Sequence, residues 1–359
     1  MSEPRRILVV RTDRLGDVIL TLPMLAVLRA RYPDAWLGML LSRYTGEIVR
    51  NHPHVNAFIW HDDAGKPRPS SDLIADIRAQ RFDTVVLVHP TPRLAWIMAR
   101  TGIPQRIGTG YRYYSVLMTH KVFEHRKDAK HHELEYNLRL LGALDPAIQT
   151  DGVKPDFGLR VQPDAAARIT SLLQDRGVGE HEMIAVIHPG SGGSARDWPL
   201  TRFGELGARL AQDPRLRLLV TGGPGETGAV HAVAKDAGPR AVPLAGALSL
   251  PELAALYARA AVVVANSTGP LHLAAALGTP VVGIYPQLTP MSPARWGPYT
   301  EKKRVLVPDA PADCRLCRKG ERCVCIASIT VDQVHDATRS FLTHTSQDGT
   351  REGTHAQQR

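Results

Sequence analysis

The sequence predicts an α/β protein with two domains, each built on a parallel sheet. The first observation is that strand-like and helix-like segments alternate in both halves of the 359 residues. The second is a polar stretch rich in Pro and Gly, over residues 144–159, that has no clear periodicity. We therefore expect an N-terminal domain over 1–155, a C-terminal domain over 156–344 and a disordered tail over 345–359.

The composition limits the class of protein. It is 43% hydrophobic and 22% charged, which is ordinary for a globular protein with sizeable cores. No apolar run approaches the ~20 residues of a membrane span, and residues 1–6 lead into a strand without a signal-peptide core. We therefore expect a cytoplasmic protein.

The charge indicates an anionic partner, because the net charge is +9 and the pI is near 9.6. Aromatic residues make up only 6% of the chain, and it has no helix-turn-helix, zinc-finger or RNP-like pattern. Nucleic acid is therefore the weakest candidate, and a phosphorylated substrate or an acidic membrane surface fits better.

The N-terminal half begins with a buried strand that runs directly into an acid-containing turn. Its expected strands are 7–11, 36–41, 57–60 and 84–89. The segment Arg11–Asp17 follows the first of these, and an apolar helical pattern follows it. Asp17 thus lies where an α/β sheet presents its ligand crevice. It could cap the helix, carry chemistry, or do both.

The C-terminal half repeats this rhythm. Its expected strands are 183–188, 217–221, 262–265 and 281–285. Each ends in a turn that carries Gly, Ser, Thr or Pro. If the two sheets face each other, both sets of turns would line one cleft.

The turn at 188–199 is rich in glycine. Gly190, Gly192 and Gly193 would let backbone N–H groups approach an anion, and Arg196 could neutralise it. The run also fits the Gly-x-Gly-x-x-Ala pattern of a nicotinamide dinucleotide site. However, the next strand ends without an acid placed for a ribose, and the turn precedes Trp198 instead of a helix. A phosphate or diphosphate cradle is favoured over a purely structural loop.

Two further turns could contact the same ligand. Ser267 or Thr268 could cap the helix expected from Leu271, so that its N-terminus forms a second anion site. His272, in the first turn of that helix, could be a ligand or a structural histidine. Glu226 follows Gly222 and Gly223 and could be a cap or a ribose ligand.

The cysteines form one cluster with the spacing C-x2-C-x5-C-x-C. Its members are Cys314, Cys317, Cys323 and Cys325. The cluster could hold a structural zinc or another thiophilic metal, although the spacing is tighter than in a zinc ribbon. Reduced structural thiols and a redox-sensitive pair are the alternatives. A catalytic role is not expected, since no histidine partner is evident nearby.

Four motifs in order resemble glycosyltransferase family 9, the heptosyltransferases of lipopolysaccharide core assembly. They are Arg-Thr-Asp-Arg-Leu-Gly-Asp-Val, His-Pro-Gly-Ser with Arg-Asp-Trp-Pro, Thr-Gly-Gly-Pro-x-Glu, and Ser-Thr-Gly-Pro-Leu-His-Leu-Ala-Ala-Ala. The resemblance runs from about residue 6 to 343. It implies a GT-B fold, with two facing Rossmann-like domains and an interdomain cleft, the acceptor on the first domain and the sugar nucleotide on the second. It also implies inverting, metal-independent transfer with no required cofactor.

The resemblance assigns roles to individual residues. Asp17 corresponds to the family's proposed general base, and Arg11 and Arg14 could meet acceptor phosphates. The positions that it assigns to the donor are Ser191, Gly192, Arg196, Gly222, Glu226, Leu248, Thr268, Gly269 and His272. Two departures stand out: Ser267 replaces an acid found in many members, and Arg196 replaces the more familiar Lys, preserving charge but changing geometry.

The expected function is that of an inverting glycosyltransferase. It would move heptose from ADP-heptose to a lipopolysaccharide-core or related glycolipid acceptor beside the anionic cytoplasmic membrane face. The alternative is a non-catalytic or divergent sugar-nucleotide-binding paralogue of the same fold. A nicotinamide-dependent dehydrogenase is a distant third.

Overall fold

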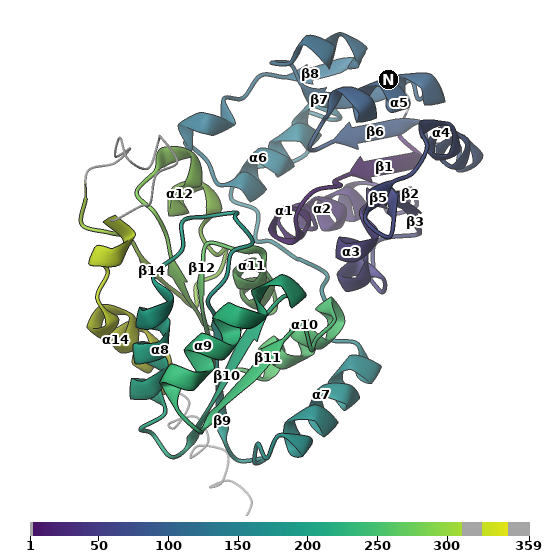
Figure 1. Cartoon of the computed structure of the whole chain (residues 1–359). Coiled ribbons are helices and arrows are strands. Elements are labelled where there is room, and N and C mark those ends of the chain that lie inside the picture. The colour runs from purple at the N-terminus through teal and green to yellow at the C-terminus, as the bar shows by residue number, and fades with distance from the viewer. Residues whose placement is uncertain (1–2, 311–324, 344–359) are drawn as a thin grey trace, which may run out of the picture. The chain divides into compact units, whose positions relative to one another are not determined.

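The computed structural model describes residues 3–310 and 325–343 of the chain. The chain divides into two compact units, Met1–Arg160 and Val161–Arg359, a few residues after the boundary expected at 155. Each unit is an α/β domain with its own sheet (Figure 1). The predictions for Cys314, Cys317, Cys323 and the tail over 345–359 lie outside the described residues.

Unit 1 contains a six-stranded parallel sheet in the order β3-β2-β1-β6-β7-β8. Its strands are β1 Arg6–Val10, β2 Trp36–Leu41, β3 Ala57–Trp60, β6 Thr84–Leu87, β7 Gln105–Thr109 and β8 His120–Val122. A small antiparallel pair, β4 Asp62–Asp63 and β5 Lys66–Pro67, lies outside it. The central strand β1 is fully buried from Ile7 to Val10, as a strand covered by helices on both faces requires.

The helices of unit 1 cover this sheet. They are α1 Leu15–Ile19, α2 Pro23–Arg31, α3 Arg43–Gly46, α4 Ser70–Ala79, α5 Pro92–Thr101 and α6 Glu133–Arg139, with 3-10 turns η1 Glu47–Val49, η2 Tyr113–Leu117, η3 Arg126–Asp128 and η4 Leu140–Ala143. Helices α4 and α5 share one core with the strands, and α2 contacts α6.

Unit 2 repeats the architecture with the strand order β11-β10-β9-β12-β13-β14, all parallel. Its strands are β9 Met183–His188, β10 Leu216–Gly222, β11 Ala241–Ala245, β12 Val262–Asn266, β13 Val281–Ile284 and β14 Lys303–Leu306. Its helices are α7 Pro163–Asp175, α8 Leu200–Leu210, α9 Thr227–Ala237, α10 Leu250–Arg259, α11 Gly269–Ala276, α12 Pro293–Trp296 and α14 Val331–Leu342, with 3-10 turns η5 Pro224–Glu226, η6 Thr289–Met291 and η7 Cys325–Ser328. Helices α8, α9 and α14 pack on one face of the sheet in a shared core.

Four strands of the two sheets were missed by the sequence pattern: β7, β8, β11 and β14. β8 has only three residues, β11 contains Pro243 and β14 begins with two exposed cations, Lys303 and Arg304. These strands lie at or beside a sheet edge. Because edge strands are only partly covered, they lack the continuous apolar run that marks a central strand.

Each sheet has one point where the chain order reverses. In unit 1 it lies between β1 and β6, whose register pairs Val10 with Leu87. In unit 2 it lies between β9 and β12, where Ala265 pairs with His188. The carboxyl ends of strands at such a point are where open α/β sheets bind ligands. Within the described residues no helix is long and apolar enough to cross a membrane.

Candidate functional site

Asp17 lies within the short helix α1 and does not cap it. The N-cap position belongs to Arg14, whose backbone is extended, and Asp17 is in the first helical turn. The prediction that Asp17 occupies the N-cap position was therefore wrong, although its charge lies in the first turn of the helix. The side chain is instead turned to a partner from the end of β1, the guanidinium of Arg11.

Arg11 gathers three carboxylates around a buried guanidinium that is only 3% exposed. Its Nη2 donates a short hydrogen bond to Asp17 Oδ1, and its Nε donates to Asp13 Oδ1 at 2.7 Å. Its Nη1 lies 3.7 Å from Oε1 of Glu133, which is 2% exposed. Burial disfavours the charge on Arg11, but the three carboxylates outweigh it and raise the pKa of Arg11.

The same surroundings favour the charged form of Arg11 but the neutral form of Asp17. Burial raises its pKa to about 6, and the neighbouring carboxylates of Asp13 and Glu133 add to the rise, while Arg11 lowers it. A carboxylate with this pKa is ionised at neutral pH and close to the basicity at which proton transfer is most effective. Asp17 thus has the ionisation behaviour of a general base.

A second layer fixes this cluster, and the sequence did not reveal it. Arg126 Nη1 donates to Glu133 Oε1 at 2.5 Å and to Asn137 Oδ1 at 3.0 Å. Asn137 Nδ2 in turn donates to the carbonyl oxygen of Leu20 at 3.0 Å, just after α1. Glu133 and Asn137 belong to α6, more than a hundred residues from Asp17, so no local pattern could associate them.

The two arginines expected to meet acceptor phosphates differ in exposure. Arg14 is exposed at the start of α1, whereas Arg11 is buried among carboxylates. His89 also lies at this end of the sheet: it follows β6, and its Nδ1 lies 3.2 Å from Asp13 Oδ2. Burial lowers the pKa of His89, which favours its neutral form. The sequence pattern predicts His89 at the end of a strand and indicates no role for it.

In unit 2, the glycine-rich turn is held by Asn266, which is fully buried at the end of β12. Its Nδ2 donates to the carbonyl of Pro189 at 2.7 Å, and its Oδ1 accepts from the N–H of Trp198 at 3.0 Å. Both ends of the 189–198 loop are thus tied to one amide side chain. Gly192 and Gly193 both have positive φ, of 53° and 73°, where glycine is favoured.

Glu226 packs against the beginning of this loop. A Cβ on Gly190 would lie 1.8 Å from Glu226 Oε1, so residue 190 can only be glycine if Glu226 keeps its place. Glu226 Oε2 accepts from the N–H of Gly223 at 2.8 Å, a cap-like contact that closes its own turn. Burial lowers the pKa of His188 to about 4, so His188 is neutral near pH 7 and donates or accepts at Thr221 Oγ1, 3.0 Å away.

The start of α11 lies beside the same loop. Ser194 Oγ donates to the carbonyl of Ser191 at 2.7 Å and to that of Ser267 at 3.2 Å. Thr268 occupies the N-cap position, but its side chain makes no cap hydrogen bond, contrary to the cap expected from the sequence. Gly269 begins the helix, and His272 is buried within it.

The remaining predicted donor residues, Gly222, Leu248 and Arg196, lie on or next to turns of unit 2. The N–H of Gly246 donates to the carbonyl of Gly222 at 2.8 Å, which joins the turn before half-buried Leu248 to the turn after β10. Arg196 is half-buried within the 189–198 loop. The predicted donor residues of unit 2 therefore lie on or next to the turns that follow the carboxyl ends of β9 to β12, and hydrogen bonds link several of these turns.

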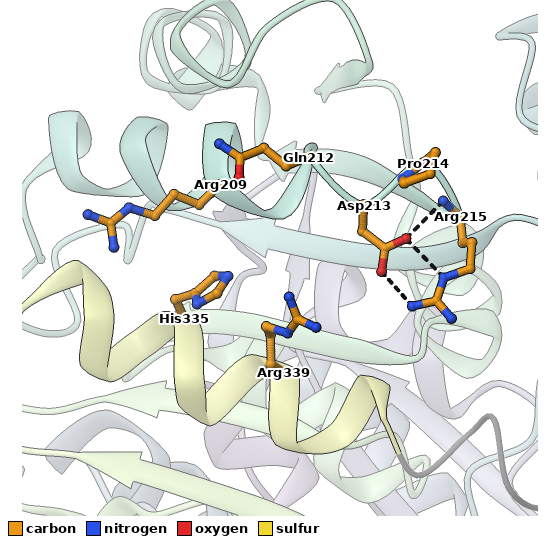
Figure 2. Close-up of a pocket in the computed structure, with 7 residues that line it drawn as sticks. All are labelled: Arg209, Gln212, Asp213, Pro214, Arg215, His335 and Arg339. Atoms are coloured by element: carbon orange, nitrogen blue, oxygen red, sulfur yellow. Dashed lines mark hydrogen bonds and ion pairs between the residues drawn. The ribbon is translucent and has the colours of Figure 1, made fainter.

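A pocket of about 440 Å³ lies elsewhere in unit 2 (Figure 2). It is lined by Arg209, Gln212, Asp213, Pro214, Arg215, His335 and Arg339. Asp213 is already engaged by Arg215, whose Nη2 donates to Oδ2 at 2.8 Å, and this bond lowers the pKa of Asp213 to about 2. The pocket is next to the beginning of β10, whereas the donor turns follow the strand ends. It is not the predicted site.

Of the four clustered cysteines, Cys325 lies within the described residues. Among residues 3–310 and 325–343, no group of three or more His, Cys, Asp or Glu side chains could hold a metal ion. Cys325, the one cysteine of the cluster inside these ranges, is half-buried at the start of η7.

Comparison with known proteins identifies the family. The sequence model of the family "Glycosyltransferase family 9 (heptosyltransferase)" matches residues 71–323, well over half of the chain. Lipopolysaccharide heptosyltransferase 3 of Escherichia coli K12 is 27% identical over 294 residues, covering 80% of this chain and 83% of the relative.

Solved structures agree on the fold. A family 9 glycosyl transferase from Veillonella parvula superposes with a TM-score of 0.85 at 22% identity, covering 96% of this chain and 99% of the other. The E. coli ADP-heptose lipopolysaccharide heptosyltransferase II has a TM-score of 0.78 at 21% identity, with 95% and 99% covered. The expected GT-B fold is thereby confirmed. The chain belongs to glycosyltransferase family 9, the heptosyltransferase family.

Proposed function

We propose that the chain transfers heptose from ADP-heptose to a lipopolysaccharide-core or related glycolipid acceptor, with inversion at the anomeric carbon. The observation that carries the proposal is Asp17, a carboxylate of pKa about 6 at the reversal point of unit 1. The donor is supported by the name of the E. coli heptosyltransferase II structure and by the turns of unit 2 that suit a diphosphate.

In the proposed reaction Asp17 removes the proton of an acceptor hydroxyl while that oxygen attacks the anomeric carbon. The bond between this carbon and the diphosphate oxygen breaks, and ADP leaves with the electron pair. Arg196 and the backbone N–H groups at the start of α11 stabilise the departing negative charge. Arg11 keeps Asp17 in place and favours its ionised form.

The proposed donor contacts are those that the family resemblance implies. Ser191 and Gly192 would meet the phosphates, and Thr268, Gly269 and His272 would meet the diphosphate. Glu226 and Gly222 would lie at the ribose, and Leu248 would line the adenine pocket. These roles are the ones that the family resemblance assigns.

The acceptor is proposed to carry negative charge and to be bound by unit 1. Exposed Arg14 is suited to an acceptor phosphate, whereas buried Arg11 is occupied by carboxylates. The chain would work as a peripheral protein at the cytoplasmic face of an anionic membrane, which its net charge of +9 favours.

We also propose that transfer needs no metal and no cofactor. The cysteine cluster would hold a structural zinc if it binds metal at all, and reduced thiols are the alternative. Elemental analysis of the purified chain decides between these two. Transfer measured with and without a chelator tests the metal-independent step separately.

The decisive experiment supplies ADP-heptose and extracted lipopolysaccharide core to the purified chain and measures ADP release and acceptor mass. A panel of other nucleotide sugars, read out by thermal stabilisation, serves as the comparison. We expect ADP-heptose to stabilise the chain most and the acceptor to gain the mass of one heptose.

A non-catalytic sugar-nucleotide binder is the second candidate, and Ser267 is the observation that favours it. This serine stands where many family members carry an acid beside the donor. Donor binding without transfer to any extracted lipid core would select this candidate and exclude the first.

A further inference from the structure

An exposed aromatic and basic surface lies on unit 1, on residues that take no part in the proposed transfer except Arg126, which also contacts Glu133. Its apolar members are Tyr111, Tyr113, Val116 and Phe123, which are 45%, 82%, 75% and 61% exposed. Tyr113, Val116 and Phe123 are the three most exposed large hydrophobic side chains among the described residues. We call residues 111–130 the aromatic–basic segment. It includes η2, β8 and η3 at the β8 edge of the sheet (Figure 1).

Two exposed aromatic side chains of this segment, Tyr111 and Phe123, are held in place by ring contacts. The rings of Tyr111 and His125 stack at 4.1 Å between centroids, and Phe123 meets Tyr111 edge-on at 5.4 Å. The Phe123 ring covers Gly110, where a Cβ would lie 2.3 Å from it. Rigid aromatic side chains lose little conformational entropy when they bind, so exposure of this kind suits an anchor.

Cations alternate with these apolar side chains along the segment. The segment contains five Lys or Arg residues and two acids, Glu124 and Asp128. Its exposed cations are Arg112, Lys121, Lys127 and Lys130. No ion pair involving any of the four is found within the part of the chain that the structure describes. Glu124 is already bound to Arg139 at 3.2 Å, which leaves exposed Asp128 as the other acid of the segment.

We propose that the aromatic–basic segment docks the protein on an anionic lipid bilayer. Exposed aromatic and aliphatic side chains would enter the headgroup region, while lysines reach the lipid phosphates around them. A protein partner fits less well, because the cores of protein interfaces are depleted of lysine. The inference rests on the proposed function in one respect: a lipid-linked acceptor would bring the enzyme to such a surface.

The test is co-sedimentation of the full chain with vesicles of phosphatidylethanolamine and phosphatidylglycerol at a ratio of 3:1. We compare the triple variant Lys121→Gln, Lys127→Gln, Lys130→Gln with the wild type. The matched control is Arg50→Gln, Lys66→Gln, Lys154→Gln, which removes the same charge from exposed positions elsewhere on unit 1. We expect the first variant to lose at least about tenfold in partition coefficient and the control to lose clearly less.

A second pair of variants tests the apolar part. Tyr113→Ser combined with Val116→Ser should weaken vesicle binding severalfold, whereas Tyr44→Ser, a 59% exposed tyrosine on α3, should not. Circular dichroism and ADP binding of each variant establish that it is folded.

Three results would overturn the docking proposal. The wild type could fail to bind these vesicles, the segment variants could bind as tightly as their controls, or sedimentation velocity without vesicles could show that the variants abolish self-association instead. The outcome is separable from the proposed function, because transfer to a detergent-solubilised acceptor is measured without any bilayer. Loss of transfer there leaves the vesicle result unchanged.

Discussion

The reversal points of the two sheets show how one architecture supports two kinds of chemistry. In unit 1 it is surrounded by charged side chains, with Arg11 bound by Asp13, Asp17 and Glu133. In unit 2 it is built from glycine turns and from neutral hydrogen bonds to Asn266 and His188. Charged neighbours shift pKa values, whereas glycine turns present backbone N–H groups. The difference favours proton transfer in unit 1 and anion binding in unit 2.

The largest expected effect concerns the proton-transfer side of this comparison. Asp17→Asn keeps the shape of the side chain but removes the base, and we expect kcat to fall by about a hundredfold to ten-thousandfold. Donor affinity, measured by calorimetry with ADP-heptose, should stay near the wild-type value because Asp17 belongs to unit 1. Near-normal turnover of the variant would contradict the assignment of Asp17 as the general base.

The next effect concerns the anion-binding side. Arg196→Ala removes a charge-assisted contact to the donor phosphates, and we expect the Kd for ADP-heptose to rise by roughly tenfold to a hundredfold. Arg209→Ala is the matched control, since Arg209 is bonded to Glu205 and lies in the pocket at the other end of the sheet. Equal losses in the two variants would contradict the assigned role of Arg196.

The pH dependence of transfer tests whether unit 1 tunes a pKa. Because the ionised form of Asp17 is the base, kcat/KM should fall about tenfold for each pH unit below about 6 and level off above it. The measurement is a pH–rate profile between pH 4.5 and 8, taken alongside donor binding at the same pH values. A profile that is flat through pH 6 would separate Asp17 from the rate-limiting proton transfer.

A smaller effect is expected from the close contact between Gly190 and Glu226. Gly190→Ala places a methyl group on the Glu226 carboxylate, and we expect a loss of about 1–3 kcal/mol in the free energy of unfolding, together with weaker donor binding. Gly225→Ala in the neighbouring turn is the control, because its Cβ would meet nothing within 4 Å. Chemical denaturation of both variants measures the difference.

The last effect is the pH dependence of stability. The folded pKa of Asp17, about 6, lies above its ordinary value of 3.8, so the folded state binds more protons between these values. The stability that Asp17 contributes therefore rises as pH falls from about 6 to 4, and is lost as pH rises again. The Tm of the wild type, relative to that of Asp17→Asn, should increase as the pH falls from about 6 to 4. A Tm difference that does not change with pH would contradict the raised pKa.

The sequence by itself determined the central strands of both sheets and the family. Strands such as β1 and β12 are covered on both faces, so they consist of nearly continuous apolar residues, and such runs can be recognised from local sequence. The glycine turns can also be recognised from local sequence, because glycine adopts positive φ more readily than other residues do. The side-chain caps suggested for Asp17 and Thr268 do not form, because a cap depends on backbone geometry that residue type alone does not fix.

Only the tertiary structure decided which distant groups meet. Glu133 reaches Arg11 across more than a hundred residues, Asn266 ties Pro189 to Trp198, and Glu226 lies on Gly190. The raised pKa of Asp17 depends on this assembly, because burial and the neighbouring carboxylates exist only in the folded chain. Local sequence can specify an acid at a strand end, but its basicity is set by what the fold packs around it.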